Sequence, residues 1–139
     1  MWKKMKAYRL KNRKYITRKH LVSILEWCRY NLGRSDFFDN ETLRIRICTK
    51  MKRFMGEFDV ERNCIYVNPK MNNDELDLIA TVIHEYVHFK QDYKEYERIE
   101  LLLPRRRNYF DHPLEKEAED AAQLLKRRCY EELKSKLDW

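Results

Sequence analysis

The sequence predicts an α+β fold in which a small, mostly antiparallel sheet of three strands packs against a long helix, with further helices toward both termini. Apolar residues recur with a period near 3.6 in three segments, and they alternate with a period of two in a segment between the first and second of these. The length of 139 residues fits one domain, and no low-complexity linker interrupts it. We therefore expect a single domain over residues 17–139, preceded by a basic N-terminal arm over residues 1–16.

The first helix is expected from Thr17 or Arg18 to about Leu32. The apolar residues of this segment fall on one face, and Gly33 follows directly, as is common where a helix ends. The apolar face consists of Leu21, Ile24, Leu25 and Cys28. This helix should cover one face of the sheet.

Three strands are expected between residues 42 and 67. Residues 42–48 alternate apolar and polar side chains, as a half-buried strand does. Residues 54–58 and 64–67 are short runs joined by a polar turn, and Asn68-Pro69 ends the second run. These segments predict a hairpin or a three-stranded sheet.

The central helix is expected from about residue 73 to residue 92. Asn72, Asn73 and Asp74 are suitable N-caps, and Asp74 and Glu75 place negative charge in the first turn. One apolar face is formed by Leu76, Ile79, Ile83, Tyr86 and Val87. The pattern therefore predicts a buried amphipathic helix.

This helix carries the sequence His84-Glu85-Tyr86-Val87-His88, which has the pattern HExxH. Residues four apart on a helix lie on the same side, so His84 and His88 can bind one metal ion while Glu85 lies beside them. A zinc ion held in this way lowers the pKa of a bound water to about 7, and the carboxylate can accept its proton during hydrolysis of a carbonyl group. Chance would produce the motif in about one shuffled sequence per hundred, which makes it informative.

A catalytic zinc site usually takes three protein ligands, so a third ligand should follow the motif. Gln91 and Lys94 occupy the positions where the pattern HExxHxxGxxH has a glycine and a third histidine, which excludes that arrangement. Residues 111–119 instead open another helical pattern. Asp111 or His112 would cap this helix, and Pro113 is favoured in its first turn.

In this region the chain resembles the gluzincins, whose HExxH helix is followed by a helix bearing Glu-x-x-Ala/Ser-Asp. The run Glu115-Lys116-Glu117-Ala118-Glu119 matches with glutamate in place of the final aspartate. The resemblance implies a zincin-like fold, a zinc-dependent endopeptidase activity, Glu115 as third zinc ligand and Glu119 as hydrogen-bond acceptor for an active-site histidine. Over about residues 43–128 the chain is most similar to the minigluzincins and related small phage-type peptidases.

Other assignments of the third ligand stay open. Glu117 would take the place of Glu115 after a shift of two residues. His112 is the rival from another family, because SprT-like DNA-associated proteases use a histidine some distance after HExxH. A further alternative is a non-catalytic zincin-scaffold protein that binds a partner and holds any zinc as a structural ion.

The segment from Tyr93 to Asn108 is expected to be an insert between the two ligand-bearing helices, with Pro104 ending any helix in it. Hydrolysis of a peptide needs a hydrogen-bond donor to the developing oxyanion, and Tyr93, Tyr96 and Tyr109 are candidates. The resemblance also implies that an edge strand beside the HExxH helix pairs with an extended peptide or protein substrate.

The net charge of +7 is uneven, since residues 1–20 contain nine Lys or Arg and no acidic residue. Such an arm can contact nucleic acid through its phosphates, or it can be a solvated, disordered terminus. The candidate contacts are Lys3, Lys4, Lys6, Arg9, Lys11, Arg13 and Lys14. The resemblance adds a third option, in which the arm or the tail over residues 130–139 covers the cleft and restrains activity.

The remaining composition indicates a cytoplasmic protein. No apolar stretch approaches the roughly 18 residues of a membrane span, and the N-terminus lacks the apolar segment of a secretory signal, so no membrane partner is expected. The four cysteines form no CxxC pair and lie within apolar patterns, which favours reduced thiols in the core.

Overall fold

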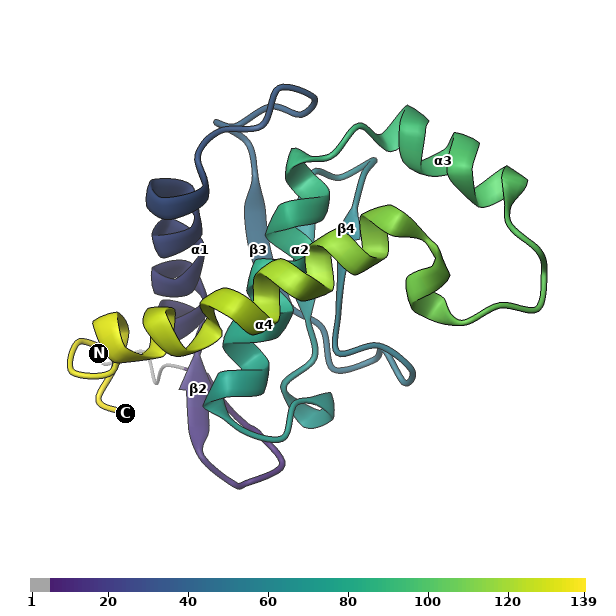
Figure 1. Cartoon of the computed structure of the whole chain (residues 1–139). Coiled ribbons are helices and arrows are strands. Elements are labelled where there is room, and N and C mark those ends of the chain that lie inside the picture. Colours follow the sequence, from purple (N-terminus) through teal and green to yellow (C-terminus); the bar gives the residue numbers. More distant parts are fainter. Residues whose placement is uncertain (1–5) are drawn as a thin grey trace.

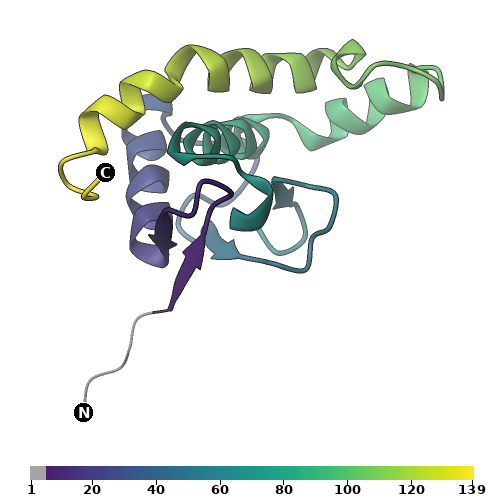
Figure 2. The ribbon, with the colours of Figure 1, turned by 90° about the horizontal axis from the view of Figure 1, so that it is seen from below.

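The computed structural model describes residues 6–139, which fold around the central helix α2 (Figure 1). The helices are α1 (Arg18–Leu32), α2 (Glu75–Lys90), α3 (Tyr93–Leu102) and α4 (Pro113–Leu133), with short 3-10 turns η1 (Pro69–Met71) and η2 (Tyr109–Asp111). The strands are β1 (Ala7–Arg9), β2 (Tyr15–Thr17), β3 (Arg44–Ile47), β4 (Gly56–Asp59) and β5 (Cys64–Val67). Seen from below, α4 lies on one side of α2, and the strands lie on the other (Figure 2). The expected α+β class is confirmed.

The three-stranded sheet has the order β3-β5-β4 and is mixed, so the expectation of a mostly antiparallel sheet was wrong for the pairing of β3. β4 and β5 form an antiparallel hairpin, whereas β3 pairs with β5 in parallel. β5 has buried Cys64, Ile65 and Val67 and takes the central position. Residues 48–55 carry the chain from β3 past β5 to the far edge of the sheet. The alternation of apolar and polar residues within one strand does not predict which strands are neighbours.

Helix α1 begins and ends where its sequence predicts. Thr17 is the N-cap and its backbone N–H donates to Nδ1 of His20 at 2.9 Å. Gly33 follows the helix with φ of 82°, a left-handed conformation that glycine adopts without a Cβ clash. The predicted apolar face is buried, and α1 packs against α2 and β3.

Helix α2 is the most enclosed of the four helices, with buried side chains in every turn. Asp74 caps it by accepting a hydrogen bond from the N–H of Asp77 at 2.9 Å. Fully buried Asn72 precedes the helix; its amide donates to the carbonyl of Asn68 at 2.8 Å and accepts from the Thr81 hydroxyl at 2.6 Å. These bonds fix the start of α2 against the end of β5.

The N-terminal segment forms a β-hairpin, which the sequence did not predict. β1 pairs with β2 in antiparallel register, and two side chains of the hairpin, Leu10 and Ile16, are buried. The backbone N–H of Lys11 donates to the carbonyl of Asn72 at 3.0 Å, so the hairpin tip is attached beside the start of α2. The hairpin was hard to recognise because Arg13, with φ of 69°, occupies a turn position that usually carries glycine or asparagine. Lys3 and Lys4, two of the candidate nucleic-acid contacts, lie outside the described residues.

The predicted insert consists of α3 and the loop that leads to η2. Asp92 caps α3, none of whose residues is buried, and the helix ends two residues before Pro104. His112 then caps α4, with Pro113 in its first turn as expected. After α4 the tail returns to α1, where Leu137 is buried and Trp139 stacks on His20 at 5.2 Å between ring centroids.

The helices and the cysteines also bear on the expectations from composition. Within residues 6–139, no helix combines the length and the apolar character that crossing a membrane requires. All four cysteines are free; Cys28, Cys64 and Cys129 are buried, and Cys48 is partly exposed.

Candidate metal centre

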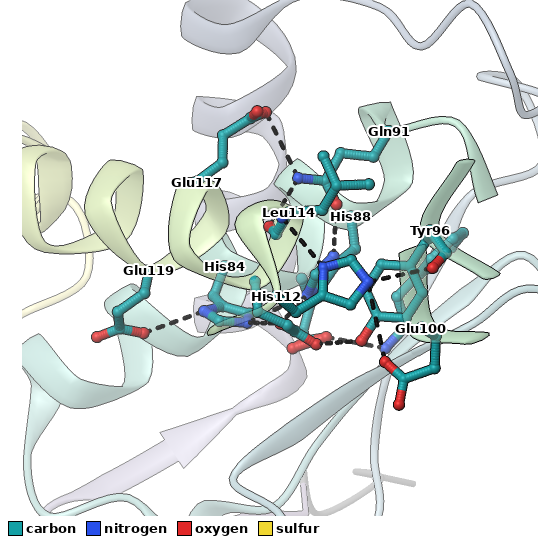
Figure 3. A network of polar contacts seen from close by, with 12 residues as sticks. His84, His88, Gln91, Tyr96, Glu100, His112, Leu114, Glu117 and Glu119 are labelled. Atoms are coloured by element: carbon teal, nitrogen blue, oxygen red, sulfur yellow. Dashed lines mark hydrogen bonds and ion pairs between the residues drawn. The ribbon is translucent and has the colours of Figure 1, made fainter. Parts of the chain in front are cut away.

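His84 and His88, which lie close together (Figure 3), form with Glu115 a group that could hold a metal ion. The two Nε2 atoms of His84 and His88 are 3.2 Å apart. Oε1 of Glu115 lies 3.1 Å from Nε2 of His84 and 2.6 Å from Nε2 of His88. Three potential ligand atoms from two helices therefore meet at one point.

The distances within this group suit a tetrahedral ion. Ligand atoms about 2.0–2.1 Å from a tetrahedral zinc ion are about 3.3 Å from one another. The separations of 3.2 and 3.1 Å are close to that value, whereas the 2.6 Å between Nε2 of His88 and Oε1 of Glu115 would have to lengthen by about 0.7 Å to admit the ion. Two imidazoles and one carboxylate also match the donor set of catalytic rather than structural zinc.

Small residues on α4 allow this convergence. Ala118 and Ala122 are fully buried, and they lie on the same helical face as Glu115, three and seven residues after it. Their short side chains let α4 cross closely over α2, with which it makes extensive contact. The carboxylate of Glu115 consequently reaches the histidines from the first turn of α4.

A hydrogen bond at Nδ1 sets the tautomer of each histidine. Nδ1 of His84 lies 3.1 Å from Oε2 of Glu119, and Nδ1 of His88 lies 2.7 Å from Oε1 of Gln91 (Figure 3). The oxygens accept, so Nδ1 carries a proton and Nε2 is the nitrogen that can bind an ion after losing its own proton. Glu119 has the position that the resemblance implied for it.

Gln91 is a site residue that sequence reasoning missed. Its side-chain nitrogen donates to the carbonyl of Leu114 at 2.9 Å, which turns its oxygen toward His88. The amide is 7% exposed, although it follows the last turn of α2. The sequence signal for this role is an amide side chain three residues after the second histidine of the motif.

Glu85 lies beside the ligand group in a protected position. It is 8% exposed, and its Oε1 accepts a hydrogen bond from the backbone N–H of Phe58 on β4 at 3.1 Å. Burial raises the pKa of the Glu85 carboxyl above its ordinary value, because desolvation disfavours the charged form. A carboxyl with a raised pKa is better matched to accepting and returning a proton near neutral pH.

Glu115 stays ionised despite its burial. Burial alone would raise the pKa of its carboxyl, but hydrogen bonds with His84 and His88 outweigh that effect and hold the pKa well below its usual range. Burial lowers the pKa of the His84 and His88 imidazoles, but their hydrogen bonds with Glu115 and the nearby carboxylates outweigh it and raise that pKa. The group therefore offers one negative charge to a cation, and each histidine becomes a neutral donor when it loses its Nε2 proton.

The three candidate tyrosines occupy different places. The hydroxyl of Tyr96 donates to Oε2 of Glu115 at 2.6 Å. Tyr109 faces the same carboxylate, which together with burial raises the pKa of its hydroxyl. Tyr93 stacks on Tyr96 with centroids 6.4 Å apart and remains 40% exposed. The structure thus brings Tyr96 and Tyr109 to the ligand group, while Tyr93 lines the adjoining cavity.

The rival ligands lie elsewhere. His112 is 1% exposed and stacks on the ring of Tyr96 at 4.1 Å; its Nδ1 accepts from the N–H of Leu114, and its Nε2 lies 3.1 Å from the carbonyl of Tyr96. Both of its nitrogens are therefore engaged away from His84 and His88, and it belongs to the join between α3 and α4. Glu117 accepts from the Gln91 amide at 3.4 Å and is likewise outside the group.

Two cavities flank the ligand group and share Phe54, Gly56, Glu85 and Tyr109 in their walls. The first, of about 320 Å³, extends under α3 and is lined by Phe58, Val60, Tyr93 and Tyr96. The second, of about 530 Å³, extends toward the start of α2 and is lined by Asp77, Thr81, Glu119 and Gln123. Neither residues 6–16 nor residues 130–139 line either cavity.

Strand β4 forms one wall of these cavities and is an edge of the sheet. The carbonyl of Met55 accepts from the N–H of Asn68, so by antiparallel alternation residues 55, 57 and 59 bond toward β5. The backbone groups of Gly56 and Phe58 then point outward, and the N–H of Phe58 is the one that reaches Glu85. The outward backbone of β4 lies beside the ligand group.

Comparison of the chain with protein-family models, with curated proteins and with solved structures gives no significant match. The site combines a group of metal-binding donors, a buried carboxylate and an edge strand along a cleft that continues on both sides.

Proposed function

We propose that the chain is a zinc-dependent endopeptidase, with His84, His88 and Glu115 as zinc ligands and Glu85 as general base. The observation that carries this proposal is the convergence of Nε2 of His84, Nε2 of His88 and Oε1 of Glu115, with buried Glu85 beside them. A structural zinc ion takes four protein donors, whereas this group among the described residues offers three. A fourth position is what a hydrolytic site requires.

Zinc fits the donor chemistry best. Imidazole nitrogen suits zinc, copper, iron and nickel, and a carboxylate in a three-residue set with two histidines is a common arrangement for hydrolytic zinc. When bound, zinc polarises a carbonyl oxygen and makes a water molecule acidic enough to act as a nucleophile near neutral pH.

The residues of the chain then have separate roles. Glu85 accepts a proton from the attacking water and returns it to the leaving amine, which needs a carboxyl with a pKa closer to neutrality, as its burial provides. The hydroxyl groups of Tyr96 and Tyr109 are the donors nearest to the ligand group and would stabilise the oxyanion. Glu119 and Gln91 hold the ligand imidazoles in orientation.

The cleft supports an extended peptide as substrate. The outward backbone groups of Gly56 and Phe58 can pair with a peptide strand laid along β4, and such pairing depends little on sequence. Cavities on both sides of the ligand group allow the peptide to continue in both directions. This geometry favours cleavage within a chain over removal of terminal residues.

The test combines metal content with one substitution. Purified protein should bind about one zinc ion per chain and cleave a quenched fluorescent peptide library. Glu85→Gln should retain zinc and lose about 10²- to 10⁴-fold in kcat, the usual contribution of a general base. Glu131→Gln, at an exposed position near the end of α4 that lines neither cavity, is the matched control and should leave the rate unchanged. Equal rates for wild type and Glu85→Gln would refute the proposal.

A further inference from the structure

The β1–β2 hairpin and the start of α1 carry a concentrated positive charge that the metal centre does not use. We call it the basic ribbon, defined by Lys6, Arg9, Lys11, Arg13, Arg18 and Lys19. All six side chains are exposed, and no ion pair joins any of them to a carboxylate among residues 6–139. Lys14 is excluded because it pairs with Glu75 at 3.3 Å. The ribbon is thus an uncompensated cationic surface.

The two faces of the hairpin differ in character. Tyr8 and Ile16 form a cross-strand pair on the inner face, which packs on the core. Arg9 and Tyr15 form the next pair, on the outer face, where the guanidinium lies 4.6 Å from the centre of the Tyr15 ring. Tyr15 is 54% exposed, and it is the one large aromatic side chain on this outer face of the described hairpin. A cation and an aromatic ring are therefore presented together to solvent.

The ribbon is held in a fixed position. Besides the bond from Lys11 to Asn72, the backbone N–H of Asn12 donates to the carbonyl of Asn73 at 2.9 Å. The side-chain amide of Asn12 donates to Oε1 of Glu75 at 2.7 Å. Its cations are consequently arranged before any ligand arrives, which lowers the entropic cost of binding.

The turn of the hairpin keeps an arginine at a strained position. Arg13 has φ of 69°, in the left-handed region where glycine and asparagine are favoured. An L side chain there destabilises the turn relative to glycine, yet the residue places one more cation at the tip. An arginine at this position is consistent with a surface that binds a ligand, because glycine would make the turn more stable.

We propose that the basic ribbon binds nucleic acid through its phosphodiester backbone. Six unpaired cations match a polyanion, and the exposed Tyr15 ring offers a stacking surface for an unpaired base. An anionic membrane is a poorer fit, because interfacial binding needs several exposed apolar side chains and the outer face presents Tyr15 alone among its described residues. A two-stranded antiparallel ribbon also has a shape that enters the major groove of duplex DNA.

This surface is separate from the metal centre. The hairpin lies beside the start of α2 (Figure 1), whereas His84 and His88 lie in the second half of that helix. No residue of the basic ribbon lines either cavity at the ligand group. Nucleic-acid binding therefore does not rest on the proposed peptidase activity, and Glu85→Gln should bind as wild type does.

Salt dependence measures the number of phosphates engaged. If the six cations each neutralise one phosphate, the slope of log K against log salt concentration should be about −5 for duplex DNA. Affinity for a 20-base-pair duplex would then fall about 10³-fold between 50 and 200 mM salt. Fluorescence anisotropy with the full chain, using that duplex and a single strand of the same length, provides both values.

Matched charge reversals locate the surface. The triple variant Arg9→Glu, Lys11→Glu, Arg13→Glu should lose at least about 30-fold in affinity and flatten the salt slope by about 2 to 3. The control Arg105→Glu, Arg106→Glu, Arg127→Glu makes the same change in net charge at exposed arginines outside the ribbon. Equal losses in the two variants would overturn the assignment. Binding to anionic phosphatidylserine vesicles without binding to either oligonucleotide would overturn it as well.

Single substitutions keep the test valid if the triple variant folds poorly. Arg13→Gly removes a cation and relieves the left-handed strain, so it should weaken binding and flatten the salt slope by about 1 while the melting temperature stays the same or rises. Tyr15→Ala should weaken binding to the single strand about tenfold. Unchanged binding in both stable variants would refute the proposal.

Discussion

Each ligand histidine has its own acceptor at Nδ1, and the two acceptors differ in charge. His84 faces the carboxylate of Glu119, whereas His88 faces the neutral amide of Gln91. A carboxylate partner makes an imidazole more basic than an amide partner does. The two Nε2 atoms are therefore not equivalent as donors. The acceptor of His88 is itself held in place by the bond from the Gln91 amide to the carbonyl of Leu114 at the start of α4.

The ligand role of Glu115 can be separated from that of Glu117 by matched amides. Glu115→Gln removes the one negative charge in the ligand group and should lower zinc affinity by more than the 10- to 100-fold typical of an outer hydrogen-bond partner. Glu117→Gln, two residues later on the same helix, should lower it by less than about threefold. Competition with a chromophoric chelator measures both values. Similar affinities for the two variants would contradict the assignment.

Gln91 should affect metal binding although it does not touch the ion. Gln91→Ala removes the acceptor for Nδ1 of His88 and should reduce zinc affinity about 10- to 100-fold. Gln123→Ala is the control, because Gln123 is exposed and its amide bonds to Glu119 without contacting a histidine. Isothermal titration with zinc distinguishes the two, and a larger effect at Gln123 would show that His84 is the histidine whose orientation matters more.

His20 makes folding stability depend on pH. Its Nδ1 accepts from the N–H of Thr17, and its Nε2 contacts the carbonyl of Leu137. Burial of the ring lowers its pKa below 6.5, and the bond to Leu137, which favours the charged ring, offsets this only in part. The unfolded chain then binds the proton more readily, and stability present above pH 6.5 is lost as pH falls toward the folded pKa. Urea unfolding at pH 7.5 and 5.5 should show a larger drop for wild type than for His20→Gln. The metal content must be the same in the wild type and in the variant at each pH.

The sequence contained enough to predict part of the candidate site and too little for the rest. The spacing of His84 and His88 follows from helical geometry alone, which is why the motif was informative. Glu115 needed the resemblance, since many acids occur in the same helix. The bond from the N–H of Phe58 to Glu85 had no sequence signal, because it joins an edge strand and a helix that only the tertiary fold brings together.

At the scale of elements, local patterns were more reliable than pairings. The expected helices over α1, α2 and α4 are confirmed, as are strands at β3, β4 and β5. The order of those strands was not predictable, because strand order depends on which strand is apolar enough for the centre and on the path of the intervening loop. The hairpin of β1 and β2 was missed because its turn lacks the glycine that marks most hairpins.

Gly56 controls how closely β4 approaches α2. A Cβ at this position would lie 2.5 Å from Cγ2 of Thr81 and 3.1 Å from the carbonyl of Tyr66. Gly56→Ala should therefore destabilise the protein by about 1–3 kcal/mol, as overpacking of a core does, and should displace β4 from Glu85. Urea unfolding measures the first effect.

A double substitution identifies the cause of that loss. Thr81→Ser removes Cγ2 and keeps the hydroxyl that donates to Asn72. Adding it to Gly56→Ala should recover part of the lost stability, whereas Thr81→Ser alone should be mildly destabilising. Strictly additive effects would mean that the two residues do not meet, and that β4 is positioned by its pairing with β5.

At the scale of the molecule, one apolar core joins all the helices except α3. Residues from the hairpin, α1, the sheet, α2, α4 and the tail contribute to it. The helix α3 and its loop lie outside this core and connect to it through the stack of His112 on Tyr96. His84, His88 and Glu115 lie at the crossing of α2 and α4, so an ion bound by them would strengthen a contact that the core already makes.

Removal of the metal should consequently lower the free energy of unfolding without unfolding the protein. The core is independent of the ligand group, in contrast to small zinc domains whose folding free energy comes from the ion. With free zinc at 100 times its dissociation constant, binding stabilises the folded state by about 2.7 kcal/mol, which corresponds to a rise in melting temperature of about 10 °C for a domain of this size. Circular dichroism should show native helix content in excess chelator and a melting temperature lower by that amount. The Glu115→Gln variant is the control, and it should melt at the same temperature with and without zinc, since it cannot hold the ion tightly.

Unfolding of the wild type by chelator at 25 °C would contradict this prediction. It would mean that the ion, and not the buried face of α2, organises the fold.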